Sequence, residues 1–216
     1  MPKRALAEHR PWLLASIVAA ALFYFFEDNA IPGLWLMLLK GTGVALLAIY
    51  ALQRHPSPDA RLIALVMALG ALGDMAIELS FAAGGAVFFA AHLVAVALYL
   101  RNIHEMRAAL GKLVAIGLFA VTPMVSWLLS GNLLVMVYSV ALGAMAAAAF
   151  ISRFPRGRVA TGAVLFVLSD WLIFSRMGPV GENALADWLI WPLYYSGQLL
   201  IATGVIQTLR GELRPG

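Results

Sequence analysis

The chain has 216 residues, of which 62% are hydrophobic and only 12% are charged. This composition is too apolar for an ordinary soluble domain and is typical of a protein that crosses a lipid bilayer several times. The 15 Lys and Arg outnumber the 11 Asp and Glu, but they form no stripe with aromatic residues, so we expect no nucleic-acid partner. The absence of cysteine excludes disulfides and thiol chemistry.

Apolar runs separated by helix breakers predict an all-α membrane protein, a bundle of eight transmembrane helices. In chain order the predicted spans are 12–26, 33–52, 61–79, 84–100, 111–129, 131–150, 159–175 and 186–209. The first run follows a basic start and resembles a signal peptide, but no small-residue cleavage site follows it, so we interpret it as a helix. We expect residues 1–216 to form a single polytopic membrane domain.

The distribution of cations predicts the direction of the spans. If eight spans alternate, 13 of the 15 cations lie on one side. They are Lys3, Arg4, Arg10, Arg54, Arg61, Arg101, Arg107, Lys112, Arg153, Arg156, Arg158, Arg210 and Arg214. The other side carries Arg176 with the acidic Glu27, Asp28, Glu182 and Asp187. The positive-inside rule then predicts both termini in the cytoplasm, and the Ala- and Arg-rich composition favours a bacterial inner membrane.

Two carboxylates lie in the apolar segment LGALGDMAIELS, and a third lies in the seventh predicted span. An ionisable side chain within a span is costly to insert and usually faces a bundle interior or a wet cavity. We therefore predict catalytic roles for Asp74 and Asp170. Glu78, one helical turn from Asp74, lies nearer the outer end of its span and is a weaker candidate. The alternative for Asp74 and Asp170 is that each pairs with Lys40, the one cation inside a span, as an internal structural contact, and the alternative for Glu78 is that it meets water at the interface.

Polar groups from six predicted spans come to a similar depth, about 9–12 Å below the outer ends at a rise of about 1.5 Å per residue. These groups are Lys40, Asp74, His92, Tyr138, Asp170 and Tyr194. His92 is a candidate acid–base residue, although a lone histidine is as often a packing residue. Lys40 has the charge to neutralise an acid or to hold a phosphate.

The last predicted span carries a polar and aromatic stripe at helical spacing, which we expect to face inward. The stripe consists of Asp187, Trp191, Tyr194 or Tyr195, and Gln198. Aromatic stripes more often serve packing, so Gln198 is its strongest binding candidate. Ser169, beside Asp170, either hydrogen-bonds near the acid or packs between helices.

The sequence contains no motif for a metal or a cofactor. It has no HExxH or paired-histidine spacing, no P-loop, no GxGxxG in a strand–helix setting and no GxSxG elbow. We therefore expect acid–base chemistry without a metal or cofactor.

Four segments carry a family resemblance: LGALGDMAIELSFAAGGAVFFAAH, YSVALGAMAAA, GAVLFVLSDWLIF and YYSGQLLIATG. In this order they resemble the signature segments of the YhhN family, whose characterised members are lysoplasmalogenases. The resemblance implies an integral membrane hydrolase that cleaves the vinyl ether bond of a lysoplasmalogen to a fatty aldehyde and glycerophosphoethanolamine or glycerophosphocholine. The family's polar signature falls on Lys40, Asp74, Glu78, His92, Tyr138, Ser169, Asp170, Tyr195 and Gln198.

On this basis we assign the candidate residues to two groups. The catalytic group is Asp74, Asp170, Glu78 and His92, and the substrate-binding group is Lys40, Tyr138, Ser169, Tyr194, Tyr195 and Gln198. Two departures from the family pattern imply a different substrate preference. Gly41 and Thr42 follow Lys40 where the family usually has Pro-Leu, and Ala95 stands where a tyrosine is frequent.

A vinyl ether resists hydroxide but is labile to acid, so a catalyst must protonate carbon and stabilise an oxocarbenium ion. This problem resembles glycoside hydrolysis, in which one carboxylic acid donates and one carboxylate stabilises or activates water. Asp74 and Asp170 fit these two roles in either order, with the ionised acid beside Lys40.

Two other functions use the same buried groups. One is a proton-coupled transporter, and the other is a lipid-binding protein without turnover. Pro123 and Pro192 do not fall at corresponding places in two halves of the chain, which weighs against a transporter.

Overall fold

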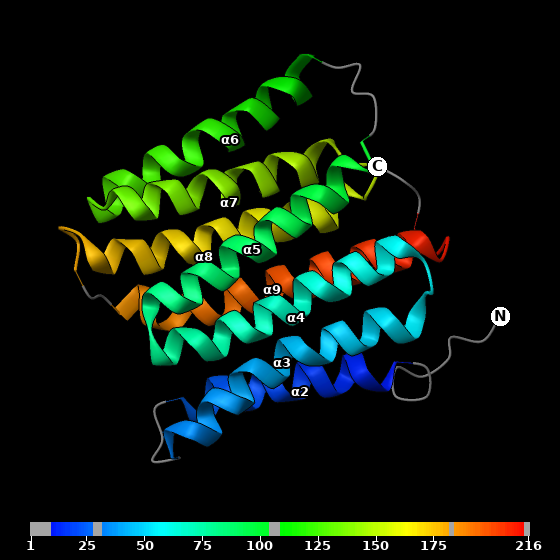
Figure 1. The fold of residues 1–216 in the computed structure, drawn as a ribbon, viewed down its shortest axis with the longest axis horizontal. Coiled ribbons are helices and arrows are strands. Elements are labelled where there is room, and N and C mark those ends of the chain that lie inside the picture. The colour runs from blue at the N-terminus through cyan, green and yellow to red at the C-terminus, as the bar shows by residue number, and fades with distance from the viewer. Residues whose placement is uncertain (1–9, 28–31, 104–108, 182–183, 214–216) are drawn as a thin grey trace. The chain divides into compact units, whose positions relative to one another are not determined.

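The computed structural model describes residues 10–27, 32–103, 109–181 and 184–213. Within these residues the chain forms eight α-helices, and its one β-bridge joins Ile103 to Ser152. The helices, labelled in Figure 1, are α2 (Pro11–Phe26), α3 (Gly33–Arg54), α4 (Pro58–Leu79), α5 (Phe81–Leu100), α6 (Ala109–Ser130), α7 (Leu133–Ile151), α8 (Thr161–Met177) and α9 (Ala184–Leu209). The all-helical prediction and its eight helices are confirmed.

Several charged residues used to predict the orientation lie outside the described residues. They are Lys3, Arg4, Asp28, Arg107, Glu182 and Arg214. The cytoplasmic position of both termini stays a prediction.

The helices divide into two compact units, Met1–Ala91 and His92–Gly216, and α5 runs through the boundary. In the first unit, α3 packs against both α2 and α4, and these three ribbons lie side by side in Figure 1. In the second unit, α6 packs on α7, α8 packs on α9, and α8 also contacts α6 and α7. That the two units form one membrane domain stays a prediction.

Seven helical segments of the described chain are long and apolar enough to cross a membrane. They are α3, α4, α5, Gly111–Ser130 of α6, α7, the segment Arg156–Met177 and α9. The segment Arg156–Met177 combines α8 with a short π-helical turn, η1 (Arg156–Ala160). The remaining helix, α2, has 16 residues and is shorter than the roughly 20 that a hydrocarbon core requires.

Local capping explains where the helices begin and end. Ser57 accepts a hydrogen bond from the Ala60 amide at 3.2 Å and Pro58 occupies the first turn, so α4 begins there. Between α6 and α7, Gly131 adopts a positive φ of 63° and Asn132 accepts a hydrogen bond from the Leu134 amide at 2.8 Å. These signals fix the hairpin that the sequence predicts.

The turn between α4 and α5 is tighter than the sequence predicts. The predicted fourth span begins at residue 84, whereas α5 begins at Phe81 and only Ser80 separates it from α4. A Cβ atom on Gly84 would lie 2.6 Å from the Ile77 Cβ atom, so the glycine permits the close return of α5. Gly84 therefore lies in the first turn of α5 and packs on α4, whereas a Cβ atom on Gly85 would have nothing within 4 Å.

The side chains of the helices divide into a buried face and an apolar outer face. In the first unit the core contains Leu47, Tyr50, Ile63 and Met67, and in the second it contains Leu142, Phe154, Val205 and Ile206. Large apolar side chains are exposed along the spans, including Leu34, Trp35, Leu128, Leu134 and Trp188. Exposed apolar surface of this extent is expected where lipid is the solvent.

Near the chain end of the second unit, α9 also packs against η1. Arg158 donates from Nη1 to Gln207 Oε1 at 2.9 Å, so a neutral amide holds this guanidinium. A Cβ atom on Gly204 would lie 2.7 Å from Val159 Cγ2, which shows how closely the two elements approach.

Candidate functional site

Three helices of the second unit bring a histidine, a tyrosine and an aspartate into one hydrogen-bonded chain. His92 of α5 places Nε2 2.9 Å from the Tyr138 hydroxyl of α7. The same hydroxyl lies 2.8 Å from Asp170 Oδ2 of α8. His92 is 3% exposed and Asp170 is 6% exposed, so both end members of this hydrogen-bonded series are buried. The structure therefore joins three residues that the sequence placed at one depth.

Aromatic rings enclose this chain. Phe166 and His92 meet edge-to-face with the ring centroids 5.0 Å apart, and Phe174 and Tyr138 meet in the same way with the centroids 5.9 Å apart. Edge-to-face contacts of this kind fix ring orientation and exclude water. We did not predict either phenylalanine as a site residue. Both lie four residues from Asp170 along α8, and this spacing is the signal that identifies them.

The aromatic enclosure continues onto α9. Phe166 also packs edge-to-face on Tyr194 with a centroid distance of 5.1 Å. Gln198 donates from Nε2 to the Tyr194 hydroxyl at 3.3 Å, and Tyr195 stacks on Trp191 at 6.0 Å. All four α9 side chains are buried, as expected for an inward stripe.

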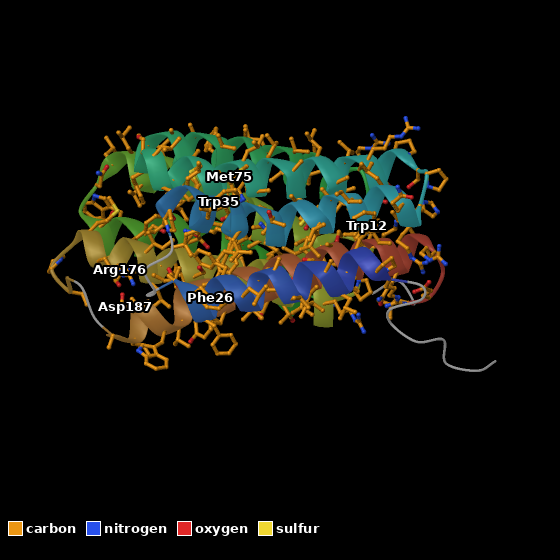
Figure 2. All side chains as sticks on the ribbon, turned by 90° about the horizontal axis from the view of Figure 1, so that it is seen from below. Trp12, Phe26, Trp35, Met75, Arg176 and Asp187 are labelled. Carbon is orange, nitrogen blue, oxygen red and sulfur yellow. The ribbon has the colours of Figure 1, made fainter. Side chains whose placement is uncertain are left out.

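Asp187, the first member of the predicted stripe, was wrongly placed in it. Its carboxylate forms an ion pair with Arg176 of α8, and the side chain is 60% exposed. Figure 2 shows the two labelled side chains together at the end of the bundle near α8 and α9. The first turn of α9 points its acid to the surface, and the buried stripe begins one turn later at Trp191.

Ser169 makes a contact between helices. Its hydroxyl donates to the Ile190 carbonyl at 2.9 Å and so connects α8 to α9. Of the two interpretations of this serine, the observed bond matches the helix-packing one. A role in substrate binding stays a prediction.

In the first unit, Lys40 of α3 and Glu78 of α4 form an ion pair with Nζ 2.6 Å from Oε1. The lysine side chain is 18% exposed and the glutamate side chain is 45% exposed. Lys40 Nζ also lies 5.4 Å from the centre of the Phe23 ring of α2. Lys40 thus meets an acid, as one of the sequence hypotheses expects, and that acid is Glu78.

Asp74 is buried on α4, at 3% exposure. The neighbouring residue Met75 packs against α3 at Gly41, where an added Cβ atom would lie 2.7 Å from Met75 Cγ and 3.1 Å from the Ala71 carbonyl oxygen. Gly41, one of the departures from the family pattern, therefore allows α3 and α4 to approach beside the buried acid. Met75 is labelled in Figure 2.

The predicted site residues thus form two groups, one in each unit. Lys40, Asp74 and Glu78 belong to the first unit, and His92, Tyr138, Ser169, Asp170, Tyr194, Tyr195 and Gln198 belong to the second. A single site that uses both aspartates stays a prediction. Within the described residues, no group of three or more His, Cys, Asp and Glu side chains has the arrangement to hold a metal ion.

The fold and the buried polar groups define a multi-pass integral membrane protein. Residues 35–205 match the model of the YhhN family, and the chain belongs to this family. Lysoplasmalogenases of Mycobacterium bovis (strain ATCC BAA-935 / AF2122/97) and Mycobacterium tuberculosis (strain CDC 1551 / Oshkosh) are each 30% identical to it over 178 residues. The matched region is 76% of this chain and 68% of each relative. No solved structure matches the chain.

Proposed function

We propose that this protein is a membrane hydrolase that cleaves the vinyl ether bond of lysoplasmalogens. The products are a fatty aldehyde and glycerophosphoethanolamine or glycerophosphocholine. Family membership and the two relatives named lysoplasmalogenase support the reaction class. The observation that carries the chemistry is a carboxyl group, that of Asp170, buried in an apolar span and hydrogen-bonded to a phenol.

The chemistry requires an acid in a dry setting. Protonation of the vinyl ether carbon gives an oxocarbenium ion, water attacks this ion, and the resulting hemiacetal collapses to the aldehyde and the glycerol hydroxyl. Asp74 and Asp170 divide the work, one as proton donor and one as the carboxylate that stabilises the cation or activates water. A lysophospholipid reaches these groups with its single chain among the spans.

Lys40 and Glu78 are the proposed head-group contacts. Lys40 has the charge to hold the phosphate, and Glu78 has the charge to meet the ammonium group. The partial exposure of both side chains supports access from the membrane surface.

Aldehyde release by the detergent-purified full chain tests the proposal. We expect aldehyde from lysoplasmalogen and none from a saturated lysophospholipid of the same head group. In D₂O the carbon next to the aldehyde group should gain one deuterium, because that carbon receives the proton. No aldehyde release, together with movement of intact lysoplasmalogen into sealed vesicles under a gradient, would instead identify a transporter.

Replacing either buried aspartate tests the acid–base assignment. We expect Asp74→Asn and Asp170→Asn each to lower kcat about 10²- to 10⁴-fold, the range for lost general acid–base catalysis. Asp59→Asn and Asp187→Asn are the matched controls, because Asp59 lies in the first turn of α4 and Asp187 is on the surface of α9. Full activity in either buried variant would exclude that aspartate from the mechanism.

A further inference from the structure

The Tyr138 hydroxyl lies between two groups that both exchange protons. Its oxygen is 2.9 Å from His92 Nε2 and 2.8 Å from Asp170 Oδ2. A phenol has one proton, so it donates to only one of these neighbours at a time and accepts from the other. The heavy-atom distances fit both directions without any movement of the rings.

The two directions correspond to two placements of one shared proton. In the first, protonated Asp170 donates to Tyr138, and Tyr138 donates to Nε2 of a neutral His92. In the second, the proton is on His92, whose Nε2 donates to Tyr138, and the Asp170 carboxylate accepts from Tyr138. Phe166 and Phe174 pack on the chain, and an apolar setting favours the uncharged placement over a buried imidazolium–carboxylate pair. The resting proton therefore belongs on Asp170.

We propose, building on the proposed function, that Asp170 is the general acid and that Tyr138 is a positioning residue whose hydroxyl changes its hydrogen-bond acceptor during the reaction. At rest the Tyr138 proton points to His92. When Asp170 gives up its proton, the phenol turns to the new carboxylate. Tyr138 thereby acts through Asp170 rather than on the substrate, in contrast to the binding role assigned from the sequence.

Hydrolysis of the vinyl ether by these groups consumes only water. The Asp170 O–H turns from Tyr138 toward the vinyl ether carbon, and this O–H bond breaks as a C–H bond forms. Water then forms a C–O bond to the oxocarbenium carbon, and one of the water protons passes to the Asp170 carboxylate. The hemiacetal hydroxyl loses a proton and the glycerol oxygen gains one as the old C–O bond breaks. Asp170 ends protonated, and the Tyr138 hydroxyl returns to His92.

The Tyr138 hydroxyl stabilises the transition state for proton transfer from Asp170 more than it stabilises the resting state. The hydrogen bond from Tyr138 to a charged carboxylate exists only after the proton begins to leave Asp170. An interaction that strengthens only toward the transition state raises kcat, whereas an interaction present throughout changes KM. His92 supplies the resting acceptor that keeps the phenol proton within reach.

The test compares Tyr138→Phe with Ser139→Ala in the detergent-purified full chain. Ser139 is the next residue on α7, and its buried hydroxyl has no hydrogen-bond partner in the part of the chain that the structure describes, so it is a matched control for loss of a hydroxyl. We expect Tyr138→Phe to lower kcat about 10- to 100-fold, as for a lost hydrogen bond to a charged group, with KM changed less than about threefold. Ser139→Ala should keep wild-type kcat.

Two variants of His92 distinguish a hydrogen-bonding role of this residue from a packing role. Their comparison does not require that Tyr138→Phe folds. Glutamine keeps an acceptor for the phenol proton and leucine does not, so we expect His92→Gln to be at least about fivefold faster than His92→Leu. Because His92 acts only through Tyr138, adding His92→Leu to Tyr138→Phe should cost less than about twofold more. Losses that multiply, or equal rates for His92→Gln and His92→Leu, would overturn the proposal.

The outcomes also distinguish the two proposals. If wild-type protein releases no aldehyde from lysoplasmalogen, the proposed function and the role of Tyr138 both fall. If wild-type protein is active and Tyr138→Phe is as fast as Ser139→Ala, only the role of Tyr138 falls. A Tyr138→Phe variant that raises KM and keeps kcat restores the substrate-binding assignment and refutes the relay.

Discussion

The ion pair between Lys40 and Glu78 is a residue-scale feature with two separable roles. It connects α3 to α4, and it is the proposed contact for a zwitterionic head group. A partly exposed pair of this kind stabilises a fold by only about 0–1 kcal/mol, so structure alone gives little reason for a lysine within a span. Its role in binding is therefore open to direct test.

Exchange of the two charges tests this role. We expect Lys40→Met to raise KM for lysoplasmalogen about tenfold or more, because a charged contact to the phosphate is lost. The double variant Lys40→Glu with Glu78→Lys keeps an ion pair between the helices but moves the cation to the other helix. We expect the double variant to recover thermal stability and not KM. Recovery of both would show that the pair serves the fold alone.

At the scale of helices, α8 and α9 approach each other closely within the second unit. A Cβ atom on Gly162 would lie 2.7 Å from the Gly197 carbonyl oxygen, and one on Gly197 would lie 2.7 Å from the Gly162 carbonyl oxygen. The two backbones therefore touch at a reciprocal glycine contact. On α8 this contact lies about one turn from Phe166 and about two turns from Asp170, and on α9 it lies within one turn of Tyr194 and next to Gln198.

Gly162→Ala should push these helices apart. Because the obstructing atoms are backbone atoms, we expect a loss of about 1–3 kcal/mol in stability, measured as a lower Tm in detergent. Gly117→Ala is the matched control, since Gly117 lies within α6 with open space around it. The control should leave Tm unchanged or raise it slightly. Equal Tm values for the two variants would contradict close packing at Gly162.

The helix boundaries can be predicted largely from the sequence, whereas contacts between helices cannot. Apolar runs and helix breakers predict the helices to within a few residues, because these signals are local, as are the caps that the structure shows at Ser57 and Asn132. The start of α5 was missed because the meaning of Gly84 depends on Ile77 of the preceding helix. Similarly, Asp170 stands out in an apolar run, whereas its link to His92 through Tyr138 requires three helices to pack.

At the scale of the whole molecule, the predicted orientation places the loop between α8 and α9 outside and the loop between α7 and α8 inside. The chain lacks cysteine, so single-cysteine variants give no background labelling. We expect Val180→Cys to react with a membrane-impermeant maleimide in intact cells. Gly157→Cys should react only after lysis. Both positions are exposed, so the reverse pattern would invert the predicted topology.

The bond between Arg158 and Gln207 bears on that orientation. A carboxylate at position 207 would bind the Arg158 guanidinium more strongly but would neutralise its charge. The amide holds the arginine between η1 and α9 at 2.9 Å and leaves the positive charge intact. The folded protein therefore keeps at Arg158 the positive charge that the positive-inside rule counts when the chain is inserted. The hydrogen bond to Gln207 anchors η1 to α9 without neutralising this charge.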